Sequence, residues 1–359
     1  MPDKSNIDHD DNIPIYIKIS VSLISLLLFL FISEFALRAM DTDFYYKNQF
    51  FPVNRDIDFT EVYKKDCDLF WRFRENQKIS SRRFSYIDYQ INSAGLRGPE
   101  IQKDKPDLRI LALGNSCTFG WGVPYEQTWV SLLQNLIEKK EDIQTEVICA
   151  GVPGYSSHQG KIFFEKELLG LEPDIVLIMF GWNDQWSAGQ GITDAEQETP
   201  SEWIIYIHNL LSPLKLYQAV RKIILTMCDD EKKVEIGDLS STCRVGIDQF
   251  YMNLRSIVRT AQNNNIQPIL LIPPVASLGI YIDADSSPLH AKHKRYQNEI
   301  RRLGQKENVP VVDLQTLFDN YNTLFDDAYS DPVHFNAQGH GVAALTIDSI
   351  INNPIYSKK

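Results

Sequence analysis

From residue 108 onward, short apolar runs alternate with longer segments of helical spacing, and no other feature constrains the fold as much. When strands and helices alternate along a chain, the strands form a parallel sheet that helices cover on both faces. The sequence therefore predicts an α/β domain with five parallel strands. The strand-like runs are RILALGN, EVICAG, DIVLIMFG, IQPILLIPP and VPVVDL, and the helical segments are YEQTWVSLLQNLIEKK, SHQGKIFFEKELLGL, GIDQFYMNLRSIVRTAQNNN, HAKHKRYQNEIRRLGQKEN and NAQGHGVAALTIDSIINN.

This domain is expected to span residues 108–355, with two attachments of different character. Residues 39–107 alternate aromatic and polar side chains and predict a juxtamembrane segment of short strands or extended pieces. Residues 185–243 interrupt the alternation after the third strand, without a clear period throughout. Because an insertion that starts at a strand end usually covers the adjoining rim, we expect a cap there. Cys228 and Cys243 bracket part of it, and their pairing in an oxidising compartment stays open.

The N-terminus contains a polar tail, residues 1–12, and an apolar segment, residues 13–38, that is long enough to cross a bilayer. Within Ile19 to Phe35 the only charge is Glu34. The alternatives are an uncleaved signal-anchor and a cleaved signal peptide; the acidic tail and the absence of an A-x-A site favour the anchor. A single-pass membrane protein is therefore expected. The flanking positive charges do not decide its orientation, since they lie on both sides: Lys4 and Lys18 before the segment, and Arg38, Lys47 and Arg55 after it.

Charge and cysteine content exclude several function classes. The chain has 47 acidic and 36 basic residues, a net charge of -11, and no basic stripe, which argues against nucleic acid as a partner. Its five cysteines form no C-x-x-C pair and no spacing with histidine that would hold zinc. We therefore expect no metal and no cofactor.

Polar residues follow the ends of the predicted strands. Ser116 lies on a glycine-flanked turn after the first strand, Gly154 follows the second, and Asn183 follows the third. Asp331 and His334 lie three residues apart just before the last helix. Because ligands bind beyond the carboxyl ends of parallel strands, we expect these residues to converge at one edge of the sheet.

These residue types match the requirements of acyl transfer. Ser116 would be the nucleophile, His334 the base that takes its proton, and Asp331 the carboxylate that orients the imidazole. The backbone N–H groups of Ser116 and Gly154 and the Asn183 amide would supply three donors to the oxyanion. Ordinary structural roles are the alternatives: Ser116 or Asp331 as a helix cap, and Asn183-Asp184 as a turn.

The blocks GNSCTFG, CAGVPG, GWND and DPVH, in this order, resemble the four blocks of the SGNH (GDSL-type) hydrolase superfamily. Each block alone is a weak signal, but all four after the expected strands are a strong one. The resemblance implies a flavodoxin-like, three-layer α/β/α fold and assigns Ser116, His334 and Asp331 to the catalytic set. It also places Gly154 and Asn183 in the oxyanion hole.

Two positions depart from the family pattern: Asn115 stands where an Asp is usual, and Cys149 stands where an Asn commonly opens the second block. Asn115 can make the same local hydrogen bonds as Asp. Cys149 cannot replace the hydrogen bonds of Asn, which bears on the placement of the Gly154 loop.

The resemblance implies a serine esterase that cleaves an O-acyl group from a carbohydrate or lipid through an acyl-serine intermediate. The catalytic domain is expected outside the cytoplasm, in a periplasmic or extracellular location. Transfer of the acyl group to another alcohol stays open, although a C-terminal Asp331/His334 pair is the arrangement of the hydrolases. The alternative from another class is a catalytically silent domain that binds glycan or scaffolds the cell envelope. The intact catalytic set favours the enzyme.

For further residues near these blocks, a role in the site is weighed against an ordinary structural or surface position. Trp121, Trp182 and Trp186 flank the site in sequence and could stack on a sugar ring, although large aromatic residues more often belong to the core. His340 is a rival base, but its place inside the last helix favours packing or exposure. Cys117 is expected in the core. The other histidines without a partner motif are expected at the surface: His158, His208, His290 and His293.

Overall fold

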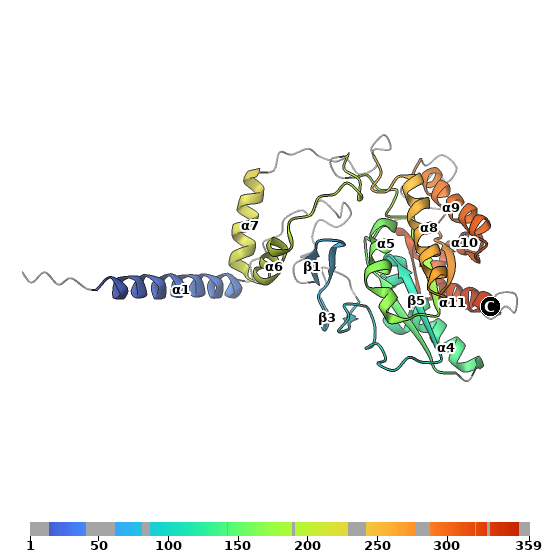
Figure 1. Ribbon diagram of the computed structural model, residues 1–359, viewed down its shortest axis with the longest axis horizontal. Coiled ribbons are helices and arrows are strands. Elements are labelled where there is room, and N and C mark those ends of the chain that lie inside the picture. The colour runs from blue at the N-terminus through green and yellow to red at the C-terminus, as the bar shows by residue number, and fades with distance from the viewer. Residues whose placement is uncertain are drawn as a thin grey trace, which may run out of the picture. The chain divides into compact units, whose positions relative to one another are not determined.

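The computed structural model describes residues 14–40, 62–80, 87–141, 143–188, 191–228, 242–276, 288–319, 321–328 and 331–351 (Figure 1). The chain divides into two compact units. One unit consists of residues 1–46 and 208–230, and the other of residues 47–207 and 231–359.

The larger unit is built on the predicted five-stranded sheet. Its strands are β5 (Leu108–Gly114), β6 (Thr145–Gly151), β7 (Ile175–Met179), β8 (Gln267–Ile272) and β9 (Val311–Asp313). They are arranged in the order β6-β5-β7-β8-β9, and every neighbouring pair is parallel. This is the strand order of flavodoxin-like proteins, and it reverses between β5 and β7. The predicted fold class is confirmed.

Helices cover both faces of the sheet because alternate side chains of each strand point to opposite sides. Leu111 and Leu113 of β5 enter one buried cluster with side chains of α5 (Ser157–Lys166), α8 (Ile247–Asn263) and α9 (Pro288–Glu307). Ile110 and Ala112 enter the other cluster with side chains of α4 (Trp129–Glu141) and α11 (Ala337–Ile351). The shorter elements of this unit are α3 (Ser116–Phe119), α10 (Leu314–Phe318), β10 (Phe325–Asp327) and β11 (Asp331–Phe335), with 3-10 turns at Tyr125–Gln127, Leu168–Leu171 and Asn322–Leu324.

The segment before the sheet contains short strands, as predicted. β1 (Tyr63–Asp66) pairs with β2 (Phe70–Phe73), and β3 (Gln77–Ile79) pairs with β4 (Tyr89–Ile91), both antiparallel. Buried aromatic side chains of these strands belong to the same cluster as Phe119 and Tyr155 of the sheet domain. The segment is therefore part of the domain core, which the sequence alone did not indicate.

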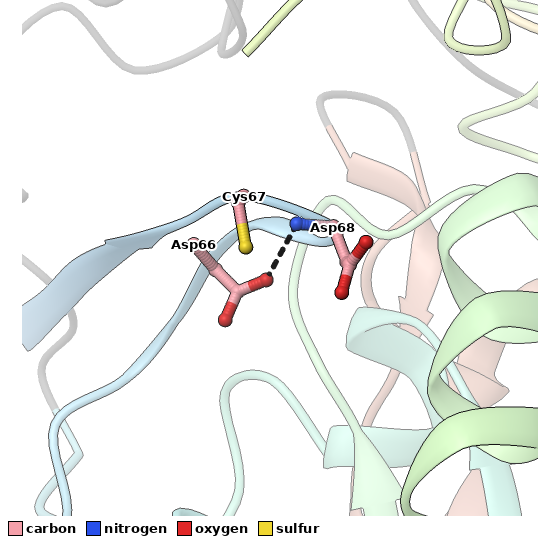
Figure 2. Close-up of side chains that lie close together, drawn as sticks. All are labelled: Asp66, Cys67 and Asp68. Carbon is pink, nitrogen blue, oxygen red and sulfur yellow. Dashed lines mark hydrogen bonds between the residues drawn. The ribbon is translucent and has the colours of Figure 1, made fainter. Parts of the chain in front are cut away.

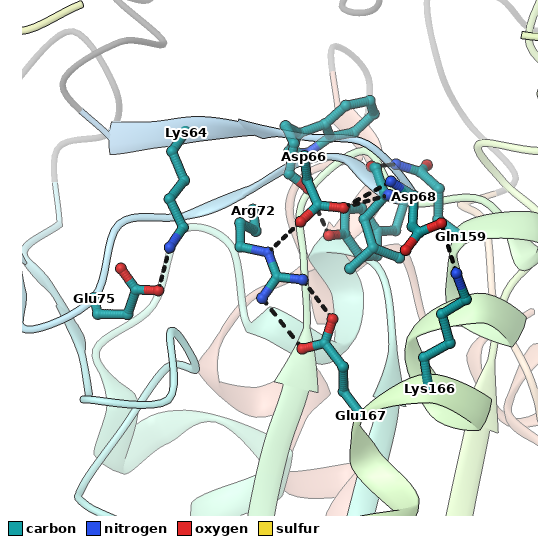
Figure 3. Close-up of polar contacts among 11 residues, drawn as sticks. Lys64, Asp66, Asp68, Arg72, Glu75, Gln159, Lys166 and Glu167 are labelled. Atoms are coloured by element: carbon teal, nitrogen blue, oxygen red, sulfur yellow. Dashed lines mark hydrogen bonds and ion pairs between the residues drawn. The ribbon is translucent and has the colours of Figure 1, made fainter. Parts of the chain in front are cut away.

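Ion pairs fix the β1–β2 hairpin to the C-terminal end of α5 (Figure 3). The Arg72 guanidinium binds Asp66 at 2.8 Å and also pairs with Glu167, while Lys166 binds Asp68 at 2.6 Å. The hairpin is thus held by charged contacts at its rim and by aromatic packing beneath.

The insertion contains two helices that its pattern did not predict, α6 (Glu202–Leu211) and α7 (Lys215–Cys228). Its two ends pair with each other. The Arg244 N–H donates to the Trp186 carbonyl at 2.7 Å, and the backbones of Ser187 and Cys243 form an isolated antiparallel β-bridge. Cys243 is a free thiol in this structure, and the side chain of Cys228 lies outside the described part of the chain. Residues 229–241 lie outside the described part of the chain.

The smaller unit contains α1 (Ile15–Ala39), which corresponds to the predicted apolar helix. Among the described residues it is the one helix that is long and apolar enough to cross a membrane. Its side chains are exposed except those of Ser33, Glu34 and Leu37, which are partly buried. The last helical turn of α6 and all of α7 belong to this unit.

Candidate active site

Ser116 is the first residue of the short helix α3, directly after β5. Its neighbour Asn115 caps the helix, because the side-chain oxygen accepts a hydrogen bond from the Cys117 N–H at 3.0 Å. Asn115 therefore makes the local bond expected of the family's Asp. α3 packs tightly on the end of β6: a Cβ added to Gly151 would lie 2.2 Å from the Phe119 nitrogen. Only glycine fits there, and this close contact fixes the position of the serine.

Three predicted side chains form a hydrogen-bonded chain. His334 Nε2 lies 2.8 Å from Ser116 Oγ, and His334 Nδ1 lies 2.7 Å from Asp331 Oδ2. Both His334 and Asp331 come from β11, which pairs with β10 beyond the sheet. The serine is 9% exposed. This geometry lets the imidazole take a proton from the hydroxyl while the carboxylate holds the ring.

Asp331 is held in its charged form. Burial alone would raise the pKa of its carboxyl, but the charge of His334 and hydrogen bonds from the His334 and Val333 N–H groups outweigh burial, so the pKa lies below its ordinary value. The alternative role of Asp331 as cap of α11 does not apply, because Asn336 accepts hydrogen bonds from Gln338 and Gly339 at the start of that helix.

Two of the predicted oxyanion donors are backbone N–H groups. Neither the Ser116 N–H nor the Gly154 N–H donates a hydrogen bond within the part of the chain that the structure describes. Gly154 has a φ of +83°, in the left-handed region that side chains rarely adopt. Asn183 lies near the same loop, since its amide donates to the Tyr155 carbonyl at 2.9 Å and retains a second hydrogen for another acceptor.

Arg244, at the end of the insertion, holds the Gly154 loop. Its guanidinium donates to the Gly154 carbonyl at 2.8 Å and to Gln159 at 2.9 Å, and it forms a bidentate pair with Asp194 at 3.1 and 2.8 Å. Asp194 also accepts a hydrogen bond from Ser156 at 2.6 Å. Sequence patterns could not indicate this network, because its members lie far apart in the chain.

Asp184 forms buried hydrogen bonds beneath the residues of the candidate site. It is fully buried and accepts hydrogen bonds from the N–H groups of Ser157 at 2.8 Å and Gly181 at 3.1 Å. Burial raises the pKa of its carboxyl to about 6, against the opposing effect of these hydrogen bonds and of Arg244. Asp184 thus joins the end of β7 to the start of α5.

Arg97 and Tyr89 hold the loop that follows α3, and the sequence did not single out either one. The buried Arg97 guanidinium donates at 2.6 Å to the carbonyls of Phe119, Gly120 and Val123. The Tyr89 hydroxyl accepts from the Gly122 N–H at 3.0 Å. Both residues precede the sheet, so the early strands also shape the surroundings of the serine.

The three tryptophans differ in position. The Trp121 ring lies 6.1 Å from the His334 ring, measured between centroids, and is partly buried. Trp182 is 8% exposed and packs edge-on against His293, so it belongs to the core. Trp186 is partly buried and lies edge-on to Trp182. Trp121 and Trp186 therefore keep surface that a substrate could meet.

Other titratable residues near the site have structural positions. His340 is buried, its Nδ1 accepts from the Trp129 N–H at 3.1 Å, and burial lowers its pKa to about 3. Cys117 is 2% exposed, as predicted, and burial raises the pKa of its thiol. The expectation that His293 lies at the surface is wrong: it is 1% exposed, because the face of α9 that carries it packs on Trp182. His158 and His208 are partly buried, and the side chain of His290 is outside the described part of the chain.

Asp66, Cys67 and Asp68 form the one cluster of potential metal-ligating side chains among the described residues (Figure 2). Asp66 already accepts hydrogen bonds from the Asp68 and Leu69 N–H groups and from Arg72. Asp68 is paired with Lys166. These bonds account for the carboxylates as parts of the hairpin turn.

The solved structures to which this chain is similar include several esterases. The chain resembles the acetyl xylan esterase AlAXEase at 22% identity, covering 68% of this chain and 100% of that one, with a TM-score of 0.45. It also resembles a catalytic mutant of Axe2, an acetylxylan esterase from Geobacillus stearothermophilus (18% identity, 70% and 97% coverage, TM-score 0.46). A lipase/acylhydrolase from Enterococcus faecalis matches at 20% identity, with 68% and 95% coverage and a TM-score of 0.43.

No curated protein matches the sequence at a significant level. The sequence model of the GDSL-like Lipase/Acylhydrolase family matches residues 112–342, which is more than half of the chain. The matched range contains all four blocks with Ser116, Gly154, Asn183 and the Asp331/His334 pair. The chain therefore belongs to the GDSL-like lipase/acylhydrolase family.

Proposed function

We propose that this protein is a serine esterase that cleaves an O-acyl group from a carbohydrate or a lipid. The observation that carries the proposal is the hydrogen-bonded chain from Ser116 Oγ through His334 to Asp331, with ring nitrogens 2.8 and 2.7 Å from their partners. A domain that only binds glycan would not need this arrangement. The catalytically silent alternative is therefore less well supported.

In the proposed reaction, Ser116 Oγ attacks the ester carbonyl carbon while its proton moves to His334 Nε2. The oxygen that becomes negatively charged accepts hydrogen bonds from the Ser116 and Gly154 N–H groups and the Asn183 amide. When the carbon–oxygen bond of the ester breaks, His334 gives its proton to the leaving alcohol, and an acyl-serine remains. Water, activated by His334, then releases the acid and restores the serine. A second alcohol in place of water would instead receive the acyl group.

The proposed place of action is the membrane surface outside the cytoplasm. α1 would act as an uncleaved signal-anchor, since its side chains are almost entirely exposed and apolar over 25 residues. The catalytic domain would then reach O-acylated saccharides or lipids of the cell envelope.

The test uses the full chain in a mild detergent with aryl esters of graded acyl length, with and without an added sugar acceptor. We expect release of the acid, and Ser116→Ala should lower turnover by several orders of magnitude, as for other triad serines. Ser349→Ala, which replaces an exposed serine on α11, is the matched control and should leave turnover unchanged. A Ser116→Ala protein with more than about a tenth of wild-type turnover would contradict the assignment. Transfer to the sugar would identify an acyltransferase.

A further inference from the structure

α7 carries an apolar stripe that faces outward. Val220, Ile223, Ile224 and Met227 follow the i, i+3, i+4, i+7 spacing of one helix face, and they are 47%, 60%, 54% and 82% exposed. An amphipathic helix of a globular protein normally turns such a stripe toward the core. Here the stripe is in contact with solvent, so it is available to a partner.

The charges of α7 are all of one sign. Its sequence, KLYQAVRKIILTMC, contains Lys215, Arg221 and Lys222 and no acidic residue. The whole chain, by contrast, has a net charge of -11. A basic helix with one exposed apolar face is typical of helices that lie in the surface of an anionic bilayer.

α7 begins beside the C-terminal end of the apolar helix α1, within the same compact unit. The Glu34 carboxylate accepts hydrogen bonds from the first-turn N–H groups of Lys215 at 3.0 Å and Leu216 at 2.8 Å. Arg38 pairs with Glu34 at 2.7 Å and donates to the Pro213 carbonyl at 2.9 Å. The one acidic side chain in the apolar helix is therefore used as a cap for α7, where free N–H groups and the helix dipole favour a negative charge.

These bonds place the start of α7 at the level where α1 would leave the hydrocarbon core. Within this unit α7 runs at a steep angle to α1, from near its C-terminal end, instead of running along it (Figure 1). The turn before α7 is fixed as well, because Tyr217 is hydrogen-bonded to His208 at 2.9 Å and Gln218 donates to the Ser212 carbonyl at 2.8 Å. A helix that starts at this level and turns across the anchor lies along the bilayer surface.

We propose that α7 is an interfacial helix whose stripe, Val220, Ile223, Ile224 and Met227, is buried in the headgroup region of an anionic bilayer next to α1. The protein is then held at the membrane by two contacts, a spanning helix and a surface helix joined to it through Glu34. The proposal shares the membrane anchor with the proposed function but does not depend on esterase activity.

The test reconstitutes the full chain in vesicles of phosphatidylglycerol and phosphatidylcholine, with Cys67, Cys228 and Cys243 replaced by Ser. An environment-sensitive fluorophore is attached either at Ile224→Cys, on the stripe, or at Thr226→Cys, exposed and two residues away on the other side of the helix. Lipids brominated in the upper acyl chain should quench the first label at least twofold more than the second. Quenching of the first label should decrease in vesicles of phosphatidylcholine alone.

Equal weak quenching of both labels would overturn the proposal, because the stripe would then be in water. A blue-shifted label at position 224 without quenching by brominated lipid would also overturn it, and would mean that protein, such as a second copy of the chain, covers the stripe. Turnover of an aryl acetate is measured on the same vesicles, so loss of the esterase assignment and loss of this proposal are separate results.

Discussion

At the residue scale, the support of the Gly154 loop explains how the site tolerates Cys149. The buried Cys149 thiol donates only a weak hydrogen bond, to the Thr118 carbonyl at 3.4 Å. The loop is instead tied down by Arg244, which binds the Gly154 carbonyl and is itself held by Asp194. A planar guanidinium that donates to several fixed acceptors can orient a loop in a way that a lysine cannot.

Arg244→Lys should therefore impair catalysis more than substrate binding. A lysine keeps the charge opposite Asp194 but cannot reach Gly154, Gln159 and Asp194 together, so the Gly154 N–H loses its fixed direction. We expect kcat to fall about tenfold to a hundredfold with little change in KM, because the oxyanion forms only in the transition state. Steady-state kinetics on a short aryl ester measure both constants.

Arg255→Lys on α8 is the matched control, since Arg255 pairs with Glu307 away from Ser116, and its kcat should stay at the wild-type value. The Arg244→Ala variant would be less informative, because it leaves the buried Asp194 carboxylate without its partner. An Arg244→Lys enzyme with a raised KM and normal kcat would show that Arg244 serves binding instead of the oxyanion.

The buried Asp184 should make stability depend on pH. Its carboxyl has a pKa of about 6 in the folded chain, whereas an unfolded aspartate titrates near pH ~3.9. The folded state therefore binds this proton more tightly, and the contribution of Asp184 to the free energy of unfolding falls as the pH rises from about 4 to about 6. Asp184→Asn lacks this titration. As the pH rises from 4 to 7, the free energy of unfolding of the variant should therefore increase by on the order of 2 kcal/mol relative to that of wild type.

Urea unfolding of the full chain in detergent, followed by tryptophan fluorescence at several pH values, measures this difference. Asp184→Asn also loses an acceptor for one of two N–H groups, so it is expected to be less stable at the acidic end of the range. The prediction concerns how steeply the free energy of unfolding changes with pH, not its absolute value. Parallel curves for wild type and variant between pH 4 and pH 6 would contradict it.

Residue-level prediction from sequence was strongest where chemistry and spacing coincide. Acyl transfer needs the side chains of Ser116, Asp331 and His334 at strand ends, and the structure brings them together. The sequence does not indicate Arg244 or Arg97, because a single arginine has no pattern and its partners here include backbone carbonyls from other segments.

At the element scale, the insertion is divided between the two compact units. Residues 185–207 belong to the unit with the sheet, and residues 208–230 to the unit with α1. The sequence did not show α6 and α7 because each has a short apolar stripe and they are separated by the turn at Ser212-Pro213.

The first residues of the insertion, which include Trp186, are the ones predicted to cover the rim of the site. Trp186 N–H bonds to the Asn183 carbonyl at 3.4 Å, so the side chain starts next to a proposed oxyanion donor and keeps part of its surface. If these residues cover the rim, Trp186→Ala should raise KM for bulky esters by roughly tenfold, about 1.4 kcal/mol, and leave turnover of a small acetyl ester almost unchanged.

The measurement compares acetyl and long-chain aryl esters and adds the thermal midpoint of unfolding as a control for packing against Trp182. Equal losses for large and small esters would mean that Trp186 serves the catalytic geometry. A large fall in the thermal midpoint would mean that it serves the core. Either result would end the cap hypothesis.

At the scale of the whole molecule, the sheet order follows from alternating strands and helices, because right-handed crossovers leave few ways to arrange five parallel strands. The places of residues 62–80 and 87–91 could not be derived in the same way. Their strands are three or four residues long and are fixed mainly by aromatic contacts with α3 and α5, for example Phe73 on Phe119. Long-range packing of this kind has no local period.

The proposed function also requires a particular orientation of the whole chain in the membrane. An esterase of envelope saccharides or lipids must face its substrate, and α1 is followed by a large domain, so we expect residues 41–359 outside the cytoplasm. Protease added to intact spheroplasts that express the full chain should digest the domain, while a cytoplasmic marker protein stays whole. The flanking charges do not impose this result, since Lys18 and Arg38 lie near opposite ends of α1. Full protection until the spheroplasts are lysed would place the domain inside, and the ester substrate would then have to be sought in the cytoplasm or in the inner leaflet.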